Sequence, residues 1–107
     1  MDNIFSPPPP RVIGDEFFET LCETDGLRIE RIVGVEPINQ PGEWFDQEDD
    51  EWVVLLSGEA ELEIKDEKIL VMKAGDSIFL PAHKIHRVNR TSASPQCIWL
   101  AVFGKMK

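Results

Sequence analysis

The side chains best suited to hold a cation lie in two short stretches of the chain. The first stretch packs six acidic residues into positions 43–51, directly before the apolar run Trp52–Leu56. The second stretch, residues 75–89, holds both histidines of the chain, His83 and His86. Carboxylate and imidazole together are typical ligands of divalent cations. The two stretches therefore indicate a cation site, and the alternative for the acidic run is a solvated turn.

Glu51 is the acidic residue that most needs a partner. It begins an apolar strand, and a carboxylate entering an apolar interior is costly unless it is paired or coordinated. Without a metal, Glu51 would pair with His86 or Arg87, or point to solvent. The neighbouring run Glu48–Asp50 is expected to be a solvated loop face. The candidate metal ligands are Asp46, Gln47, Glu51 and His86, with His83 as a further candidate.

The elements that must position these side chains are predicted to be β-strands. Short apolar segments alternate with turn signals such as Ser57-Gly58 and Gly75-Asp76, a spacing typical of an all-β sandwich or barrel. Residues 14–23 also fit a helical stripe, so a helix stays open there. The predicted strands are 17–22, 27–35, 51–56, 60–64, 68–72, 77–80, 85–89 and 96–103.

Two of these strands are apolar on both faces. Trp52–Leu56 and Cys97–Phe103 carry almost no polar side chain at either alternating position. Strands of this kind are covered on both sides, so one face is expected to line the interior and the other to meet a second sheet or a subunit partner. We therefore expect a homodimer, since a short chain gains much from further burial.

Length and charge limit the domain count and the partners. A chain of 107 residues suits one domain, predicted over residues 11–107 behind a proline-rich arm, residues 1–10, that ends in Pro7–Pro10. The formal charge of -9 argues against nucleic acid or an anionic membrane as partner. No apolar run approaches the roughly 18 residues of a membrane span. With Cys22 and Cys97 expected to be free thiols, the predicted localisation is cytoplasmic.

The spacing of these residues resembles the two sequence motifs of the cupin superfamily. Glu51 is followed by six residues and then Gly58, as in the later half of the first motif, G-x5-H-x-H-x3-4-E-x6-G. Gly75, Pro81 and His86 stand at the offsets of the second motif, G-x5-P-x-G-x2-H-x3-N. The resemblance implies a small antiparallel β-barrel of the jelly-roll type.

The chain also departs from both motifs. The H-x-H pair is replaced by Trp44 and Asp46 if four residues precede the glutamate, or by Phe45 and Gln47 if three do. The glycine of P-x-G is His83, and Asn89 comes one position before the asparagine of the pattern, where Arg90 stands. The motif glutamate and the second-motif histidine are kept, and both first-motif histidines are lost.

The resemblance implies a small-molecule pocket with a divalent metal, namely iron, manganese, nickel or zinc. It also implies a metal-dependent enzyme on a small organic substrate, such as an oxygenase, an isomerase or a decarboxylase. The alternatives are a binding or sensing module without turnover and a structural dimer with a filled core. The aromatic residues expected in the pocket lining are Trp44, Trp52, Phe79 and Trp99.

Overall fold

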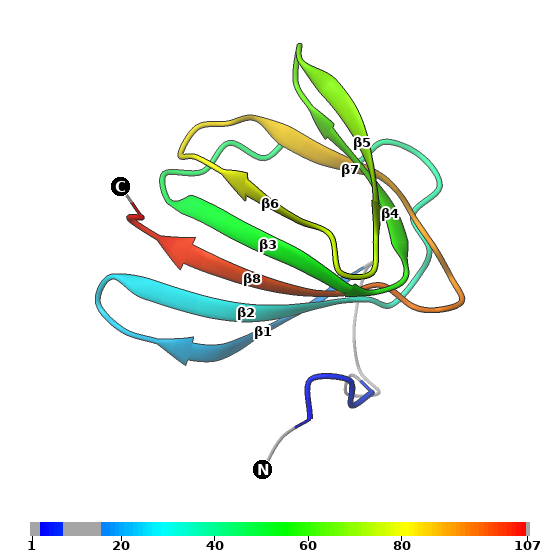
Figure 1. Cartoon of the computed structure of the whole chain (residues 1–107), viewed down its shortest axis with the longest axis horizontal. Helices are drawn as coiled ribbons and strands as arrows, with labels where there is room; N and C mark the ends of the chain where they lie inside the picture. The colour runs from blue at the N-terminus through cyan, green and yellow to red at the C-terminus, as the bar shows by residue number, and fades with distance from the viewer. Residues whose placement is uncertain (1–2, 8–15, 107) are drawn as a thin grey trace.

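In the described part of the chain, eight antiparallel strands form two sheets that face each other. The computed structural model describes residues 3–7 and 16–106, and its strands surround a common interior (Figure 1). One sheet has the order β1-β2-β8-β3-β6 and the other the order β5-β4-β7. The predicted all-β antiparallel architecture is confirmed. The strands are β1 Glu16–Glu23, β2 Leu27–Gly34, β3 Asp50–Ser57, β4 Glu59–Ile64, β5 Lys68–Lys73, β6 Ser77–Leu80, β7 His86–Thr91 and β8 Ile98–Gly104.

The first strand resolves the helix-or-strand alternative in favour of a strand. β1 pairs with β2 in an antiparallel register that sets Phe18 opposite Ile32 and Phe17 opposite Val33. Since neighbouring residues of a strand point to opposite faces, Phe18 faces the interior and Phe17 the outer side. Pairing along β2 satisfies the backbone groups of β1, so tertiary structure overrides the helical pattern of this segment.

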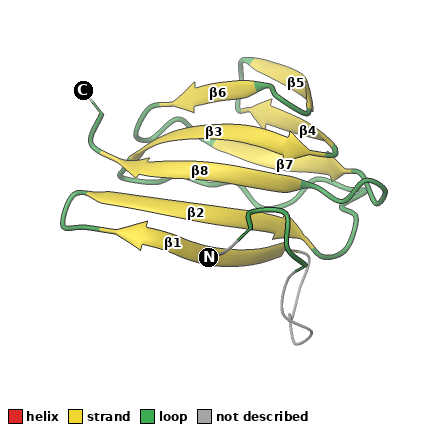
Figure 2. Cartoon of the chain, turned by 60° about the horizontal axis from the view of Figure 1, so that its bottom comes forward, coloured by secondary structure: helices red, strands yellow, loops and turns green. Residues whose placement is uncertain are grey.

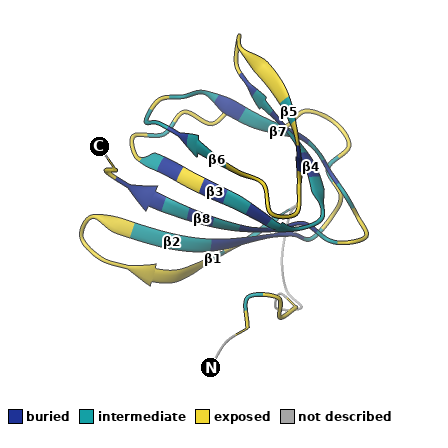
Figure 3. Ribbon diagram, in the orientation of Figure 1, coloured by how far each residue is buried: buried dark blue, intermediate teal, exposed yellow. Residues whose placement is uncertain are grey.

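β3 and β8 lie at the centre of the larger sheet and alternate between two apolar faces. Val53 and Leu55 of β3 are buried inside, whereas Trp52, just before Val53, and Val54, between the two, are more exposed (Figure 3). Val102 of β8 pairs with Trp52 and therefore shares its outward face. This outer face is turned toward the viewer in Figure 2, and the second sheet lies behind it on the inner side. Within the described chain, the second sheet thus covers the inner face of β3 and β8.

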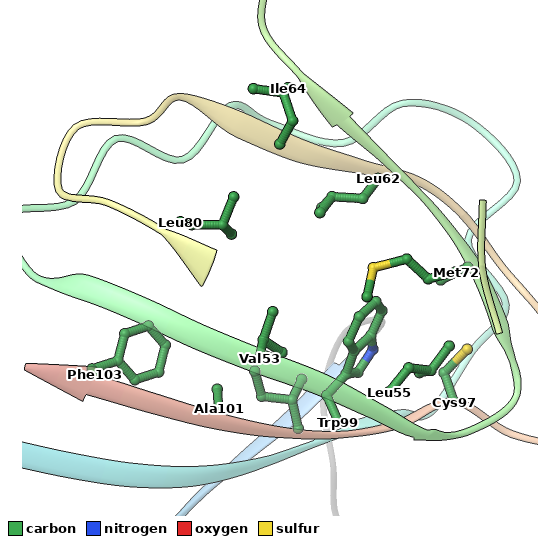
Figure 4. Packing of buried hydrophobic residues seen from close by; sticks show 12 residues of the cluster. Val53, Leu55, Leu62, Ile64, Met72, Leu80, Cys97, Trp99, Ala101 and Phe103 are labelled. Carbon is green, nitrogen blue, oxygen red and sulfur yellow. The ribbon is translucent and has the colours of Figure 1, made fainter. Parts of the chain in front are cut away.

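One end of the interior is closed by tight packing. Leu55 and Cys97 are fully buried there, beside Met72 and Trp99 (Figure 4). Gly58, at the turn into β4, has a φ of 88°, and a Cβ on it would lie 2.8 Å from the Cys97 Sγ. Only glycine combines that backbone conformation with so close an approach. The motif glycine is therefore a packing requirement of the closed end.

A β-bulge in β7 leaves its apolar side chains on the inner face of the sheet and its charged side chains on the outer face. Val88 pairs with Leu62 and Arg90 pairs with Glu61, so Asn89 is an extra residue between them. Without this insertion the alternation that turns His86 and Val88 inward would turn Arg90 inward as well. The bulge instead leaves Arg90 on the outer face, where its guanidinium lies 3.0 Å from Glu59.

Residues 3–7 lie against the outer face of the larger sheet, over β2. The buried guanidinium of Arg31 donates to the carbonyl oxygens of Ile4 (3.1 Å) and Ser6 (2.6 Å). Its Nε also donates to Glu19 on β1 at 2.8 Å. Half of the predicted proline-rich arm, residues 1–2 and Pro8–Pro10, lies outside the described residues. No helix in the described part of the chain is long and apolar enough to cross a membrane.

Candidate functional site

The open end of the interior forms a pocket of about 560 Å³, its mouth included. Thirteen of the described residues, from seven strands and the loop before β3, line it, and nine of them are apolar. The exposed rings of Phe18 and Phe45 mark its mouth. The lining residues are Glu16, Phe18, Ile32, Phe45, Gln47, Glu51, Val53, Leu62, Leu80, His86, Val88, Trp99 and Phe103.

Glu51 and His86 meet in the wall of this pocket, although they come from different sheets. The Glu51 Oε1 lies 3.7 Å from the His86 Nε2, and both residues are only 6% exposed. The gap is longer than a direct hydrogen bond. Gln47 completes the group, because its amide Nε2 donates to the same Glu51 oxygen at 2.7 Å. The polar atoms of the pocket are thus concentrated at one point of its wall.

The backbone before β3 brings the two sheets together at this point. Phe45 pairs with His86 as an isolated antiparallel bridge, and each donates its backbone N–H to the other's carbonyl, at 2.7 and 3.1 Å. The Gln47 carbonyl accepts from the His83 N–H at 2.8 Å. These bonds fix the loop from Phe45 to Gln47 against the start of β7, and so hold Gln47 beside Glu51.

The ring of His86 has a defined orientation. Its Nδ1 lies 2.8 Å from the carbonyl oxygen of Lys84, which is only an acceptor, so Nδ1 carries a proton and donates it. In the neutral imidazole, Nε2 then presents a lone pair toward Glu51 and the pocket. The Phe45 ring covers one side of the imidazole, with 5.7 Å between centroids.

Burial raises the pKa of the Glu51 carboxyl above its usual value near 4.5. The donated hydrogen bond from Gln47 and the nearby His86 act in the opposite direction, and Glu30 adds to the increase. Desolvation outweighs these bonds because a buried carboxylate loses the hydration that stabilises its charge. Glu51 is therefore a group that accepts and releases a proton closer to neutral pH than an exposed glutamate does.

The acidic residues around the start of β3 have different surroundings: the surface, a loop contact or the pocket. Asp46 turns to the surface and lies 2.8 Å from the His83 ring, where both side chains are more than half exposed. Asp50, expected in a solvated loop face, instead accepts hydrogen bonds from the N–H groups of Ala82 (2.8 Å) and Met106 (2.9 Å). Most of this run thus belongs to the surface or to loop anchoring, and Glu51 alone enters the pocket.

The structure separates the candidate metal ligands into two groups. Glu51, Gln47 and His86 come together in the pocket wall, whereas Asp46 and His83 pair with each other outside it. His83 has a φ of 64°, the left-handed conformation for which the family pattern has a glycine. This backbone directs its side chain away from the interior.

The two spacings left open for the lost H-x-H pair are also resolved. Phe45 and Gln47 line the pocket, whereas Trp44 is exposed and Asp46 is at the surface. The three-residue spacing to Glu51 is therefore the one that places side chains inside. An apolar ring and an amide stand where the resemblance implies two imidazoles.

Of the four aromatic residues expected in the lining, only Trp99 is part of it. Trp44 stacks instead under the Arg87 guanidinium, 4.0 Å from its ring centroid. Trp52 and Phe79 pair with each other on β3 and β6, on the outer face. The Trp99 Nε1 is buried and has no hydrogen-bond partner among residues 3–7 and 16–106, and in Figure 4 it is turned toward Leu55 and Cys97 at the closed end.

The aromatic lining that the sequence reasoning missed comes from Phe18, Phe45 and Phe103. Strand alternation was the available signal for Phe103, since it shares a face with Trp99 and Ala101 on β8. Phe18 was hidden by the helix-or-strand ambiguity of its segment. Phe45 lies in a loop, where alternation gives no information.

The donor set matches only part of what a tightly held divalent ion needs. His86 and Glu51 are suitable ligands, and Gln47 adds an amide whose N–H is already bonded to Glu51. Among the described residues there is no group of three or more His, Cys, Asp or Glu side chains placed to hold a metal. The set therefore falls short of the three His and one Glu that the resemblance implies.

Comparisons with known proteins agree with this fold. The family model described as "Cupin domain" matches residues 32–103. A crystal structure from Ralstonia eutropha JMP134, provisionally named as a mannose-6-phosphate isomerase, is 39% identical with a TM-score of 0.84, covering 98% of this chain and 97% of its own. No curated protein matches the chain.

More distant solved structures share the fold alone. An RmlC-like cupin from Shewanella frigidimarina NCIMB 400 is 21% identical with a TM-score of 0.73, over 91% of this chain and 82% of its own. KdgF from Halomonas sp. is 16% identical with a TM-score of 0.73, over 91% and 86%. With its two-sheet architecture, its partial match to the motif spacing and a family match over most of its length, the chain belongs to the cupin family.

Proposed function

We propose that this cupin domain binds a small organic molecule in the pocket at the open end of its interior. The observation that carries the proposal is the pair Glu51 and His86, two buried titratable side chains 3.7 Å apart in an otherwise largely apolar wall. Buried polar groups are normally hydrogen-bonded, and this gap leaves room for a bridging partner. A hydroxyl of a ligand would fill that role, because it can donate its proton to the His86 Nε2 and accept one from the Glu51 carboxyl when that group is protonated.

The two side chains would also serve acid–base chemistry on such a ligand. The His86 Nε2 accepts a proton in the tautomer that its bond to Lys84 selects. Glu51, with its raised pKa, exchanges a proton nearer neutral pH than an ordinary glutamate. A ligand that is only bound and a substrate that is converted would therefore both contact the His86 Nε2 and the Glu51 carboxyl. We therefore test binding first.

The two histidines provide a matched test of the binding proposal. The full chain would be screened against a panel of metabolites by melting shift, and each compound that stabilises it would be tested on His86→Ala and His83→Ala. We expect at least a tenfold loss of affinity, about 1.4 kcal/mol, for His86→Ala and no loss for His83→Ala. The proposal would be contradicted if no compound of the panel stabilised the chain, or if the compounds that did bound equally well to His86→Ala.

A metal-bound form of the same site is a second candidate. It is favoured by the distance between the Glu51 Oε1 and the His86 Nε2, which suits two ligands of one ion with bonds of about 2.0–2.2 Å. Gln47, Glu51 and His86 would hold the ion, which would polarise a bound oxygen. Since these donors are few, further ligands would have to come from water or from the bound molecule.

Elemental analysis tests the metal candidate directly. Protein purified without a metal-affinity tag would be analysed for iron, manganese, nickel and zinc, alongside Glu51→Gln and the surface control Asp46→Asn. One ion per chain that is lost in Glu51→Gln and kept in Asp46→Asn supports the metal form. A metal content below one tenth per chain, also after incubation with each of the four ions, removes it.

The name of the Ralstonia structure suggests a sugar-phosphate isomerase, and we do not propose that activity for this chain. A phosphate carries about two negative charges and is normally held by arginine, lysine or helix N-termini. The described lining of the pocket contains neither arginine nor lysine. The similarity supports the fold and the pocket more strongly than it supports that substrate.

We also propose that the chain forms a homodimer through the outer face of its larger sheet. Trp52 and Val54 of β3 and Leu100 and Val102 of β8 present apolar side chains there, and no second layer covers them within the described chain. Light scattering would test this with Leu100→Asp and with Val71→Asp, a control on the exposed part of β5. A dimer that both variants retain would contradict the assignment.

A further inference from the structure

The charge and shape of the pocket carry information about the class of molecule that it takes. Nine of its thirteen lining residues are apolar, and four of those nine carry aromatic rings: Phe18, Phe45, Trp99 and Phe103. Such walls favour a flat, mostly apolar body.

The titratable groups of the lining are two carboxyls and one imidazole. Glu16 and Glu51 supply the carboxyls and His86 the imidazole. A proton on His86 would be balanced by the Glu51 oxygen 3.7 Å away, so the wall offers an anion no net positive charge. Moving a phosphate or carboxylate into this apolar space without a cation would cost several kcal/mol.

The cationic side chains near the pocket are already engaged. Arg28, beside the mouth, stacks 4.5 Å over the Phe103 ring, and its Nε lies 3.0 Å from Glu30. Arg87 forms an ion pair with Glu63 on the outer face at 2.9 Å. Lys84 forms an ion pair with Glu67. An anionic ligand would have to compete with these carboxylates for a cationic partner.

We propose that the ligand of this pocket is an uncharged, largely apolar molecule, with a ring body and a single hydroxyl group placed between Glu51 and His86. The inference rests on the proposed function and narrows it to a substrate class. Anionic metabolites, phosphorylated sugars included, are excluded from the pocket. The aromatic lining holds the ring, and the pair of polar side chains selects the one polar group.

Matched probes of equal body and different charge test this inference on the full chain. Benzyl alcohol would be compared with benzyl phosphate, and mannose with mannose 6-phosphate, by melting shift and by titration calorimetry. At tenfold its dissociation constant, benzyl alcohol is expected to raise the melting temperature by several degrees, and the two phosphates and mannose to leave it unchanged.

Two valines on different faces show whether a probe occupies the pocket. Val88 lines the pocket, whereas Val71 on β5 is 54% exposed on the opposite side of its sheet. Val88→Phe is expected to weaken benzyl alcohol at least tenfold, and Val71→Phe to leave it unchanged. If Val88→Phe does not fold, methyl NMR of the parent gives the same answer: probe-induced shifts at Val53 and Val88, with none at Val71.

Two results would overturn the inference. One is binding of either phosphate ester at the Val88 side of the sheet, and the other is a lack of benzyl alcohol binding there. Neither result removes the proposed function, which fails only if the metabolite panel also yields no ligand sensitive to His86→Ala.

Discussion

The two ends of strand β3 point side chains into the same interior but meet different surroundings. At the closed end, Leu55 is fully buried among Met72, Trp99 and other apolar side chains. At the open end, four positions earlier on the same face, Glu51 faces a pocket and a histidine across a gap. The comparison teaches that an inward-facing position in a strand does not by itself show whether its side chain packs in the core or lines a pocket. The polar residue at a position where packing would favour leucine marks the functional end.

The largest expected effect tests the closed end. Leu55→Ala should lower the free energy of unfolding by about 2–5 kcal/mol, since it opens a cavity in a fully packed site. Leu21→Ala on β1, where the side chain is 44% exposed, should cost less than about 1 kcal/mol. Urea unfolding measures both. Similar losses for the two leucines would show that the closed end is not packed as described.

The two motif glycines provide a second test of the packing at the closed end. Gly58 and Gly75 have φ values of 88° and 97°, so alanine at either position is expected to cost about 1–2 kcal/mol from backbone strain. At Gly58 the new Cβ would also lie 2.8 Å from the Cys97 Sγ, whereas at Gly75 nothing lies within 4 Å. We expect Gly58→Ala to lose about 1–3 kcal/mol more than Gly75→Ala in urea unfolding. Equal losses would mean that the packing at the closed end relaxes freely.

Much of the fold was predictable because it depends on local signals. Turn glycines and alternation located the strands, and the resemblance to the cupin motifs selected Glu51 and His86 as candidate ligands of one site. The motif spacing then allowed two alignments of the loop before β3. Choosing Phe45 and Gln47 over Trp44 and Asp46 needed the backbone bridge to His86, which is a long-range contact. The pairing of Asp46 with His83 likewise depends on the left-handed backbone conformation of His83, which the sequence does not predict.

The pH dependence of stability contrasts Glu51 with an ordinary glutamate. Its pKa is raised by burial, so the folded state holds the proton more tightly than the unfolded state does. The parent should therefore lose stability as the pH rises from the unfolded value near 4.5 through the folded value. Glu51→Gln, which keeps an acceptor for Gln47, should lack this loss, so its melting temperature should exceed the parent's at pH 7 by more than at pH 4. An unchanged difference across that range would contradict the burial of the charge.

Glu63, on the outer face of the smaller sheet, should give the smallest effect and the opposite sign. Hydrogen bonds from Asn89 and Arg87 lower the pKa of its carboxyl, because they favour the ionised form. Its contribution is present above the unfolded pKa and disappears as the pH falls through the folded value. Glu63→Gln should thus lower the melting temperature slightly at pH 7 and not at pH 3, measured in the same series as Glu51→Gln. A carboxylate that has its partners supports the fold at neutral pH, whereas one that faces a pocket opposes it. If both variants changed the melting temperature at pH 7 in the same direction, that distinction would be wrong.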